Sequence, residues 1–107
     1  MSKENRDKGQ RFEDDLARLL GIKTTARSGA HWDDADLRGS GFILEAKVKA
    51  TKNYFSSSRK EIDKVKHQAD RLGVDWVYAV RDGRDNDYIL CSSDFFAELY
   101  DRAKNNE

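Results

Sequence analysis

The stretch Gly41–Ala50, "GFILEAKVKA", decides the fold of this chain. It opens with an apolar run at 42–44, which is typical of a buried strand. Glu45 and Lys47 then place opposite charges in the same strand, and burying a charge is costly unless it is paired or bound to a metal. Because side chains alternate between the faces of a strand, these two charges share one face.

The residues before this strand predict its first partner. A Gly-Ser-Gly turn at 39–41 is typical of a hairpin, and a second strand begins near Asp36. If the hairpin closes at this turn, Asp36 lies across from Glu45, although a slip of one residue would change the face. Two carboxylates and the Lys47 ammonium would then converge at one end of the hairpin.

Hydrophobic periodicity and turn residues predict the element order α, β, β, β, α, β, β, α along the chain. The helices are expected at 7–20, at 58–72 with a Ser58–Glu61 capping box, and from Ser92 or Ser93 to about Ala103. Besides the hairpin, strands are expected at 22–26, 75–81 and 88–91. The expected inward-facing residues of the helices are Phe12, Leu16, Leu19, Leu20, Ile62, Val65, Ala69, Leu72, Phe95, Phe96, Leu99 and Tyr100. A helix that joins two parallel strands implies an α/β domain whose mixed sheet is flanked by helices.

The composition is that of one globular domain. The 107 residues are 37% hydrophobic and 37% charged, so we expect a single domain over 1–107 with frayed ends at 1–6 and 104–107. No apolar run approaches the ~20 residues that span a bilayer, and the first ten residues do not resemble a secretory signal. The single cysteine, Cys91, excludes an internal disulfide, so a cytoplasmic location without membrane contact is expected.

The distribution of charge bears on possible partners. Lys plus Arg and Asp plus Glu both number 20, so the net charge is zero. Residues 47–66 nevertheless carry seven basic side chains against two acidic ones. Such a run favours either a DNA-contacting surface or a solvated helix face, and charge alone does not separate the two.

The chemistry of the predicted cluster favours a metal. Crowded carboxylates such as Asp36 and Glu45 repel each other, so one would stay protonated unless a cation is bound. Hard oxygen ligands of this kind suit Mg²⁺, and Glu13 at the edge of the first helix would be a third carboxylate. Lys47 then acts on a phosphate or on the attacking water, as in metal-assisted phosphodiester hydrolysis. The alternative is a plain cross-strand ion pair within an E-x-K tripeptide.

The ordered set "GQRFEDDLARLLG", "ARSGA", "DADL", "FILEAK" and "HQADRLG" resembles the PD-(D/E)XK nuclease superfamily. Within it, the chain is similar to the small archaeal and phage Holliday-junction resolvases and related phage endonucleases, over roughly Gly9 to Val80. The resemblance implies a restriction-endonuclease-like αβββαβ core, here with an extra C-terminal strand and helix. It also implies a Mg²⁺-dependent endodeoxyribonuclease of DNA recombination, in which Mn²⁺ substitutes and branched DNA is the substrate. Two symmetric cuts in a junction would need a homodimer.

The resemblance also assigns roles to residues. The metal ligands are Glu13, Asp36, Glu45 and the backbone carbonyl of Ala46; the further catalytic residues are Lys47 and Gln68; and the DNA contacts are Arg27 and Ser28. Lys49, Lys52 and Arg59 of the basic run are expected to bind DNA as well. Ala35 stands where the family motif has a proline, and Asp33 and Asp34 are rival carboxylates to Asp36. The alternative function is a catalytically inactive nucleic-acid-binding module of the same fold, and a third reading is an interaction domain whose E-x-K is only an ion pair.

Overall fold

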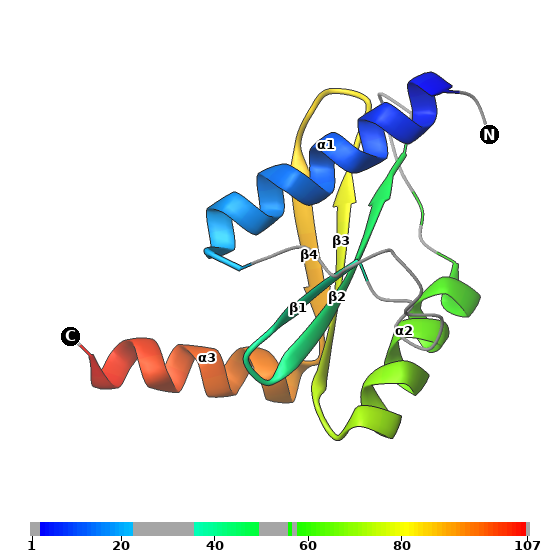
Figure 1. The fold of residues 1–107 in the computed structure, drawn as a ribbon. Coiled ribbons are helices and arrows are strands. Elements are labelled where there is room, and N and C mark those ends of the chain that lie inside the picture. Colours follow the sequence, from blue (N-terminus) through cyan, green and yellow to red (C-terminus); the bar gives the residue numbers. More distant parts are fainter. Residues whose placement is uncertain (1–2, 23–35, 50–55, 57, 107) are drawn as a thin grey trace.

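The computed structural model describes residues 3–22, 36–49, 56 and 58–106 (Figure 1). The elements in chain order are α1 (Lys3–Leu20), β1 (Leu37–Gly39), β2 (Phe42–Val48), α2 (Arg59–Leu72), β3 (Asp75–Arg81), β4 (Asp87–Cys91) and α3 (Ser93–Asn105). The strand expected at 22–26 lies, apart from Ile22, outside the described residues. The outer helices extend further than expected, from Lys3 in α1 and to Asn105 in α3.

The four strands form one mixed sheet in the order β1-β2-β3-β4. β1 and β2 are antiparallel, β2 and β3 are parallel, and β3 and β4 are antiparallel. The pair Gly39↔Phe42 closes the hairpin over Ser40 and Gly41, and Gly41 has a φ of +85°, which favours glycine. The α/β class, the mixed sheet and the hairpin turn are therefore confirmed.

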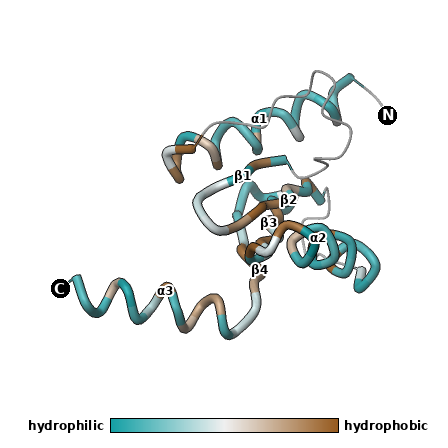
Figure 2. The backbone as a smooth tube through the Cα atoms, turned by 60° about the horizontal axis from the view of Figure 1, so that its bottom comes forward, coloured by the Kyte–Doolittle hydropathy of each residue, from teal (hydrophilic) through white to brown (hydrophobic). Residues whose placement is uncertain are grey.

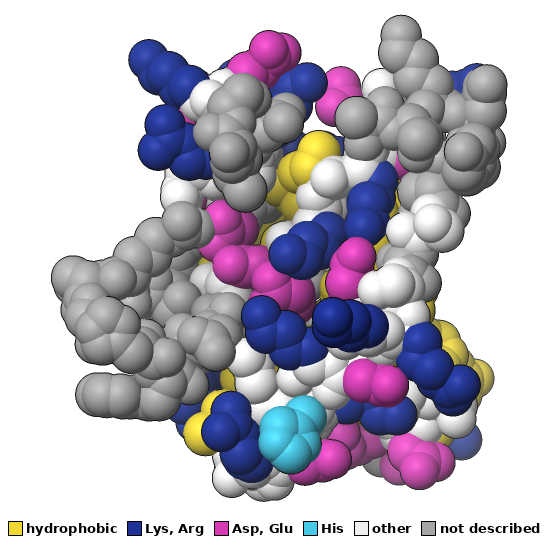
Figure 3. All heavy atoms as spheres, turned by 90° about the vertical axis from the view of Figure 1, so that its right-hand side faces the viewer, with side chains coloured by type: hydrophobic (Ala, Val, Ile, Leu, Met, Phe, Trp, Pro, Cys, Tyr) yellow, Lys and Arg dark blue, Asp and Glu magenta, His cyan; other side chains and the backbone are white. Residues whose placement is uncertain are grey.

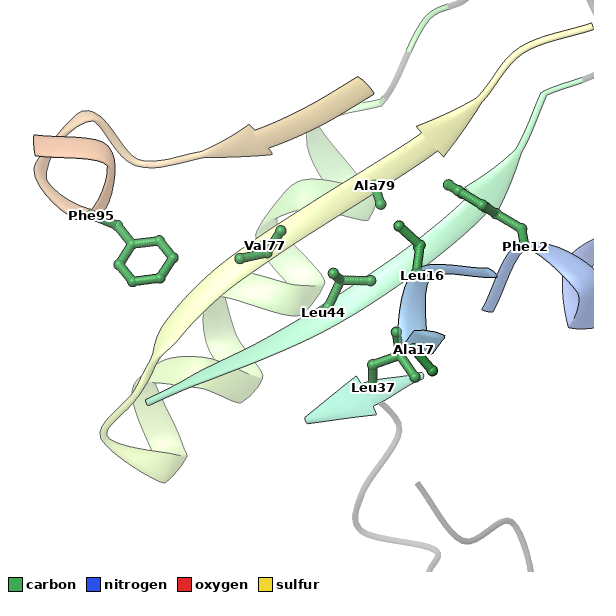
Figure 4. Close-up of a cluster of buried hydrophobic side chains, with 8 residues drawn as sticks. All are labelled: Phe12, Leu16, Ala17, Leu37, Leu44, Val77, Ala79 and Phe95. Atoms are coloured by element: carbon green, nitrogen blue, oxygen red, sulfur yellow. The ribbon is translucent and has the colours of Figure 1, made fainter. Parts of the chain in front are cut away.

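Helices cover both faces of this sheet (Figure 1). On one face, side chains of α1 pack with those of the strands and with Phe95 of α3 in one hydrophobic cluster. The buried residues of this cluster are Phe12, Leu16, Ala17, Leu37, Leu44, Val77, Ala79 and Phe95 (Figure 4). On the other face α2 packs against a smaller cluster, composed of Ile43, Val65, Ala69, Tyr78 and Val80. Figure 2 shows the resulting pattern, with hydrophobic strand positions enclosed between hydrophilic helices. Since Ile43 faces α2, the alternation along β2 directs Glu45 and Lys47 to the α2 face as well.

The ends of α2 follow the sequence signals only in part. The Ser58 hydroxyl accepts a hydrogen bond from the Glu61 backbone N–H at 3.1 Å, and Gly73 ends the helix with a φ of +70°. The Glu61 carboxylate, however, does not serve a capping box but turns to the sheet, where it accepts hydrogen bonds from Lys49 and from the Tyr78 hydroxyl. A tertiary contact thus replaces the local one.

Several side chains that were expected to face inward are exposed. Leu19 of α1 is 80% exposed, and Phe96 and Tyr100 of α3 are 63% and 61% exposed. Leu20, Leu72 and Leu99 are more than one-third exposed as well. The inward assignment is wrong for these residues. Figure 1 shows that α1 and α3 extend beyond the sheet.

Arg81 at the end of β3 joins α1 to the sheet. Its guanidinium bonds both oxygens of Asp87 at 2.8 and 3.0 Å and Asp15 at 2.9 Å, and it lies 4.6 Å from the centre of the Phe12 ring. A planar fork of donors that stacks on a ring is a geometry that lysine cannot reproduce.

Arg81→Lys is therefore expected to lower the free energy of unfolding by about 1–2 kcal/mol, measured by urea denaturation. Arg102→Lys is the matched control, because Arg102 pairs with Glu98 on the exposed surface of α3. The control should change stability by less than ~0.5 kcal/mol. Equal effects of the two substitutions would contradict the role given to Arg81.

Candidate functional site

Asp36 and Glu45 meet at the open end of the β1–β2 hairpin. The ladder pairs Leu37 with Leu44, and one further step places Asp36 opposite Glu45. The two carboxyl groups share a hydrogen bond. The Asp36 carboxylate also accepts a hydrogen bond from the Ala46 backbone N–H at 2.8 Å, which fixes it beside β2. The sequence predicted this convergence, and the structure contains it.

Burial and charge determine the protonation of this pair. Burial is the largest cause that raises the pKa of Glu45 from 4.5 to about 8, and the charge of Asp36 and the hydrogen bond to Asp36 add to it. Lys47 and Lys64 lower the pKa, but by less than these causes raise it. The raised pKa favours the protonated form of Glu45, whose carboxyl group is hydrogen-bonded to that of Asp36. A shared proton offsets the repulsion that two ionised carboxylates would have.

Lys47 supplies a positive charge next to this pair. Its Nζ lies 3.8 Å from Oε1 of Glu45, and its side chain is 46% exposed, whereas that of Glu45 is 16% exposed. The ammonium therefore borders the carboxyl pair on one side and solvent on the other. This position allows contact with an incoming anion.

Ala46 adds a backbone oxygen to the same edge. In an antiparallel strand the N–H and the C=O of one residue point toward the same neighbour. Because the Ala46 N–H points toward Asp36, the Ala46 carbonyl is directed to that side of β2 too. The oxygen atoms available there belong to Asp36, Glu45 and Ala46, which is a donor set that hard cations prefer.

Glu13 does not join this group. It is buried, with 6% of its surface exposed, on α1, and α1 covers the sheet face opposite to the one that carries Glu45 and Lys47. Among the described residues, no group of three or more His, Cys, Asp or Glu side chains could hold a metal ion. Of the three carboxylates expected to converge, the structure thus brings together two.

The second helix carries Gln68, which was expected at the site, and Lys64, which was missed. Gln68 is 6% exposed and lies on the buried side of α2, together with Val65 and Ala69. Lys64 precedes Gln68 by one helical turn, and its charge acts on Glu45. The signal that could have identified Lys64 is its i, i+4 spacing from Gln68.

The expected DNA-binding residues differ in how accessible they are. Lys49 pairs with Glu61 at 3.2 Å and its side chain is only 25% exposed, so it is engaged within the protein. Arg59 is exposed at the start of α2. Arg27, Ser28 and Lys52, with the rival carboxylates Asp33 and Asp34, lie outside the described residues. Figure 3 shows that basic and acidic side chains alternate over the α2 side of the molecule.

None of the described helices combines the length and the apolar character that crossing a membrane requires. Comparison with protein-family models found no match. Comparisons with curated proteins and with solved structures found none either.

Proposed function

We propose that this chain is a metal-dependent DNA endonuclease with the restriction-endonuclease-like fold that its sequence resembles, and that branched DNA is its substrate. The observation that carries the proposal is the Asp36–Glu45 carboxyl pair, in which the pKa of Glu45 is raised to about 8. Carboxyl groups that have a strongly perturbed pKa and a lysine beside them are typical of functional sites. The connection from β2 through α2 to the parallel strand β3 supports the proposed fold.

The donor set at the hairpin fits a Mg²⁺ ion. Asp36, Glu45 and the Ala46 carbonyl would hold it, since Mg²⁺ takes one or two carboxylates and completes its shell with water and substrate phosphate. The cation would replace the proton of Glu45, because metal ligands must be deprotonated. Two carboxylates and a carbonyl are sufficient for this set, so Glu13 is not required as a direct ligand.

The roles of the residues follow from their positions. When bound, the metal would polarise a phosphoryl oxygen and lower the pKa of a bound water. Lys47, half exposed beside the carboxyl pair, would hold the scissile phosphate and stabilise the charge that develops on it. Asp36 is held in place by the Ala46 N–H, so it is already positioned before a ligand arrives. Lys64 adds positive charge to the same site from α2.

A second candidate is a DNA-binding module of the same fold without catalysis. It is favoured because the resemblance implies three carboxylates at the metal site, whereas the described residues contain no group of three or more His, Cys, Asp or Glu side chains that could hold a metal ion. The two candidates share DNA binding and differ in cleavage. An interaction domain would show neither property.

Metal dependence tests the proposal directly. The protein is incubated with linear duplex, single-stranded DNA and a four-way junction, in Mg²⁺, Mn²⁺ or excess EDTA. We expect cleavage with either metal and none in EDTA, since the metal supplies the activated water. Binding of DNA without cleavage in any condition would favour the second candidate. Cleavage that persists in EDTA would contradict the proposed site.

A matched pair of variants locates the metal. Asp36→Asn should weaken Mn²⁺ binding, measured by calorimetry without DNA, by at least about tenfold. Asp63→Asn removes the same charge from an exposed position on α2 and should leave Mn²⁺ affinity unchanged. Equal affinities of the two variants would exclude Asp36 as a ligand, whatever the activity on DNA.

A further inference from the structure

The carboxylate of Glu61 reaches from α2 to the sheet and holds a lysine there. Its two oxygens lie 3.2 and 3.3 Å from Nζ of Lys49, the residue that directly follows β2. The hydroxyl of Tyr78 on β3 donates a hydrogen bond to the same carboxylate. Because the Tyr78 side chain is buried in the cluster beneath α2, its hydroxyl fixes where the carboxylate lies.

Glu61 carries its negative charge at neutral pH. The hydrogen bond from Tyr78 is the largest of the causes that lower the pKa of Glu61. The hydrogen bond and the charge of Lys49 lower it further, and so does the charge of Lys47. The carboxylate therefore acts on both lysines, but it forms its close ion pair with Lys49.

Lys47 and Lys49 are otherwise alike in position. The backbone N–H of Lys49 donates to the carbonyl of Arg81 at 2.8 Å, so the pairing with β3 continues to this residue. Two residues apart on an extended strand, the two lysines lie on the same face and about 7 Å from each other. Their exposure differs nevertheless, because the side chain of Lys47 is 46% exposed and that of Lys49 is 25% exposed.

We propose that Glu61 is a positioning residue, which holds Lys49 within the protein and thereby leaves Lys47 to receive the DNA phosphate. The identity of this anion rests on the proposed function, whereas the restraint on Lys49 does not. Lys47 is two residues beyond Glu45 and Lys49 is four, so a phosphate bound at Lys49 would lie farther from the carboxyl pair. A chain in which both lysines are available would bind DNA in two positions, and only one of them would lead to cleavage.

Acylation of lysine side chains, followed by mass spectrometry, tests the restraint without DNA. Lys60, which is exposed on α2, is the internal reference. In the wild type Lys49 should react more slowly than Lys60, and in Glu61→Gln its rate relative to Lys60 should rise at least about threefold, because the ion pair is lost. The amide oxygen of glutamine still accepts the Tyr78 hydrogen bond, so the variant should fold. Equal reactivity of Lys49 in the wild type and in Glu61→Gln would overturn the proposal.

DNA binding in EDTA tests the consequence for the substrate. Glu61→Gln should bind duplex DNA at least about threefold more tightly, and the logarithmic salt dependence of its affinity should steepen by about 0.9, the value for one further phosphate contact. Glu61→Gln/Lys49→Met replaces the ion pair with two neutral side chains, so both quantities should return to their wild-type values. Asp63→Asn removes the same charge from an exposed position on α2 and should leave the salt dependence unchanged.

Single-turnover cleavage in Mg²⁺ at saturating protein separates positioning from a purely structural role. The rate of Glu61→Gln should fall by about the factor by which its affinity rises, since DNA bound at Lys49 is not cleaved. The double variant should recover the wild-type rate. A residue that only stabilised the fold would not combine tighter binding with slower cleavage.

The outcomes distinguish this inference from the proposed function. Unchanged DNA affinity of Glu61→Gln would overturn the positioning role, and so would tighter binding that persists in Glu61→Gln/Lys49→Met. A wild-type chain that binds no DNA would instead overturn the proposed function. The acylation rates would then still decide whether Glu61 restrains Lys49.

Discussion

Replacing Lys47 with methionine is expected to slow DNA cleavage at least about 100-fold while DNA affinity changes less than about threefold. The expected loss of rate is that of removing one group that stabilises charge in a transition state. Affinity depends on several phosphate contacts, so the loss of one changes it modestly. Methionine retains most of the length of the side chain and removes only the charge. Single-turnover cleavage at saturating protein and a separate binding titration measure the two quantities.

Arg59→Met is the matched control for Lys47→Met. Arg59 is exposed at the start of α2, and it carries the same charge as Lys47. Its removal should weaken binding and flatten the salt dependence of the affinity, while the cleavage rate at saturation stays within about twofold. A Lys47→Met variant that cleaves at the wild-type rate would remove the basis for the proposed mechanism.

The second large effect concerns stability without metal, and it follows from the pKa of Glu45. The pKa of Glu45 is about 8 in the folded protein, whereas its ordinary value, which applies to the unfolded chain, is 4.5. Between these two pH values the folded state therefore keeps a proton that the unfolded state loses. The contribution of Glu45 to stability is thus complete below pH 4.5 and is lost as pH rises toward 8. At about 1.4 kcal/mol per pKa unit, the loss is on the order of 3 kcal/mol by pH 7.

Glu45→Gln should remove this loss, because an amide is neutral at every pH. The variant and the parent should differ little in the pH dependence of stability below pH 4.5. Between pH 4.5 and pH 7 the variant should gain on the order of 3 kcal/mol relative to the parent, measured by urea denaturation in EDTA. Asp63→Asn, at an exposed position, should show no comparable gain.

The opposite result has a defined meaning. If Glu45 were ionised and held only by its ion pair with Lys47, Glu45→Gln would lower stability at pH 7. Added Mg²⁺ further distinguishes a metal site from a plain ion pair. A cation that binds the folded protein stabilises the parent by mass action, and it should stabilise the Glu45→Gln variant less. A destabilised variant together with a parent that does not respond to Mg²⁺ would favour the ion-pair reading.

Local patterns in the sequence were enough to predict the hairpin and its carboxyl pair. The Gly-Ser-Gly turn determines where the hairpin closes, and the two-residue period of a strand determines that Glu45 and Lys47 share a face. The register then brings Asp36 opposite Glu45. Each of these relations spans about ten residues or fewer, so no distant part of the chain is needed to establish it.

Contacts between distant segments decided the rest. The sequence identified Glu13 as a polar residue at the edge of an apolar stripe, but which face of the sheet α1 covers depends on the packing of Phe12 and Leu16 against β2 and β3. In the same way, the period of α3 predicts an apolar face but not what covers it. Periodicity shows which side of a helix is apolar, and only tertiary packing determines how much of that side lies on the sheet, because the sheet is built from strands remote in sequence.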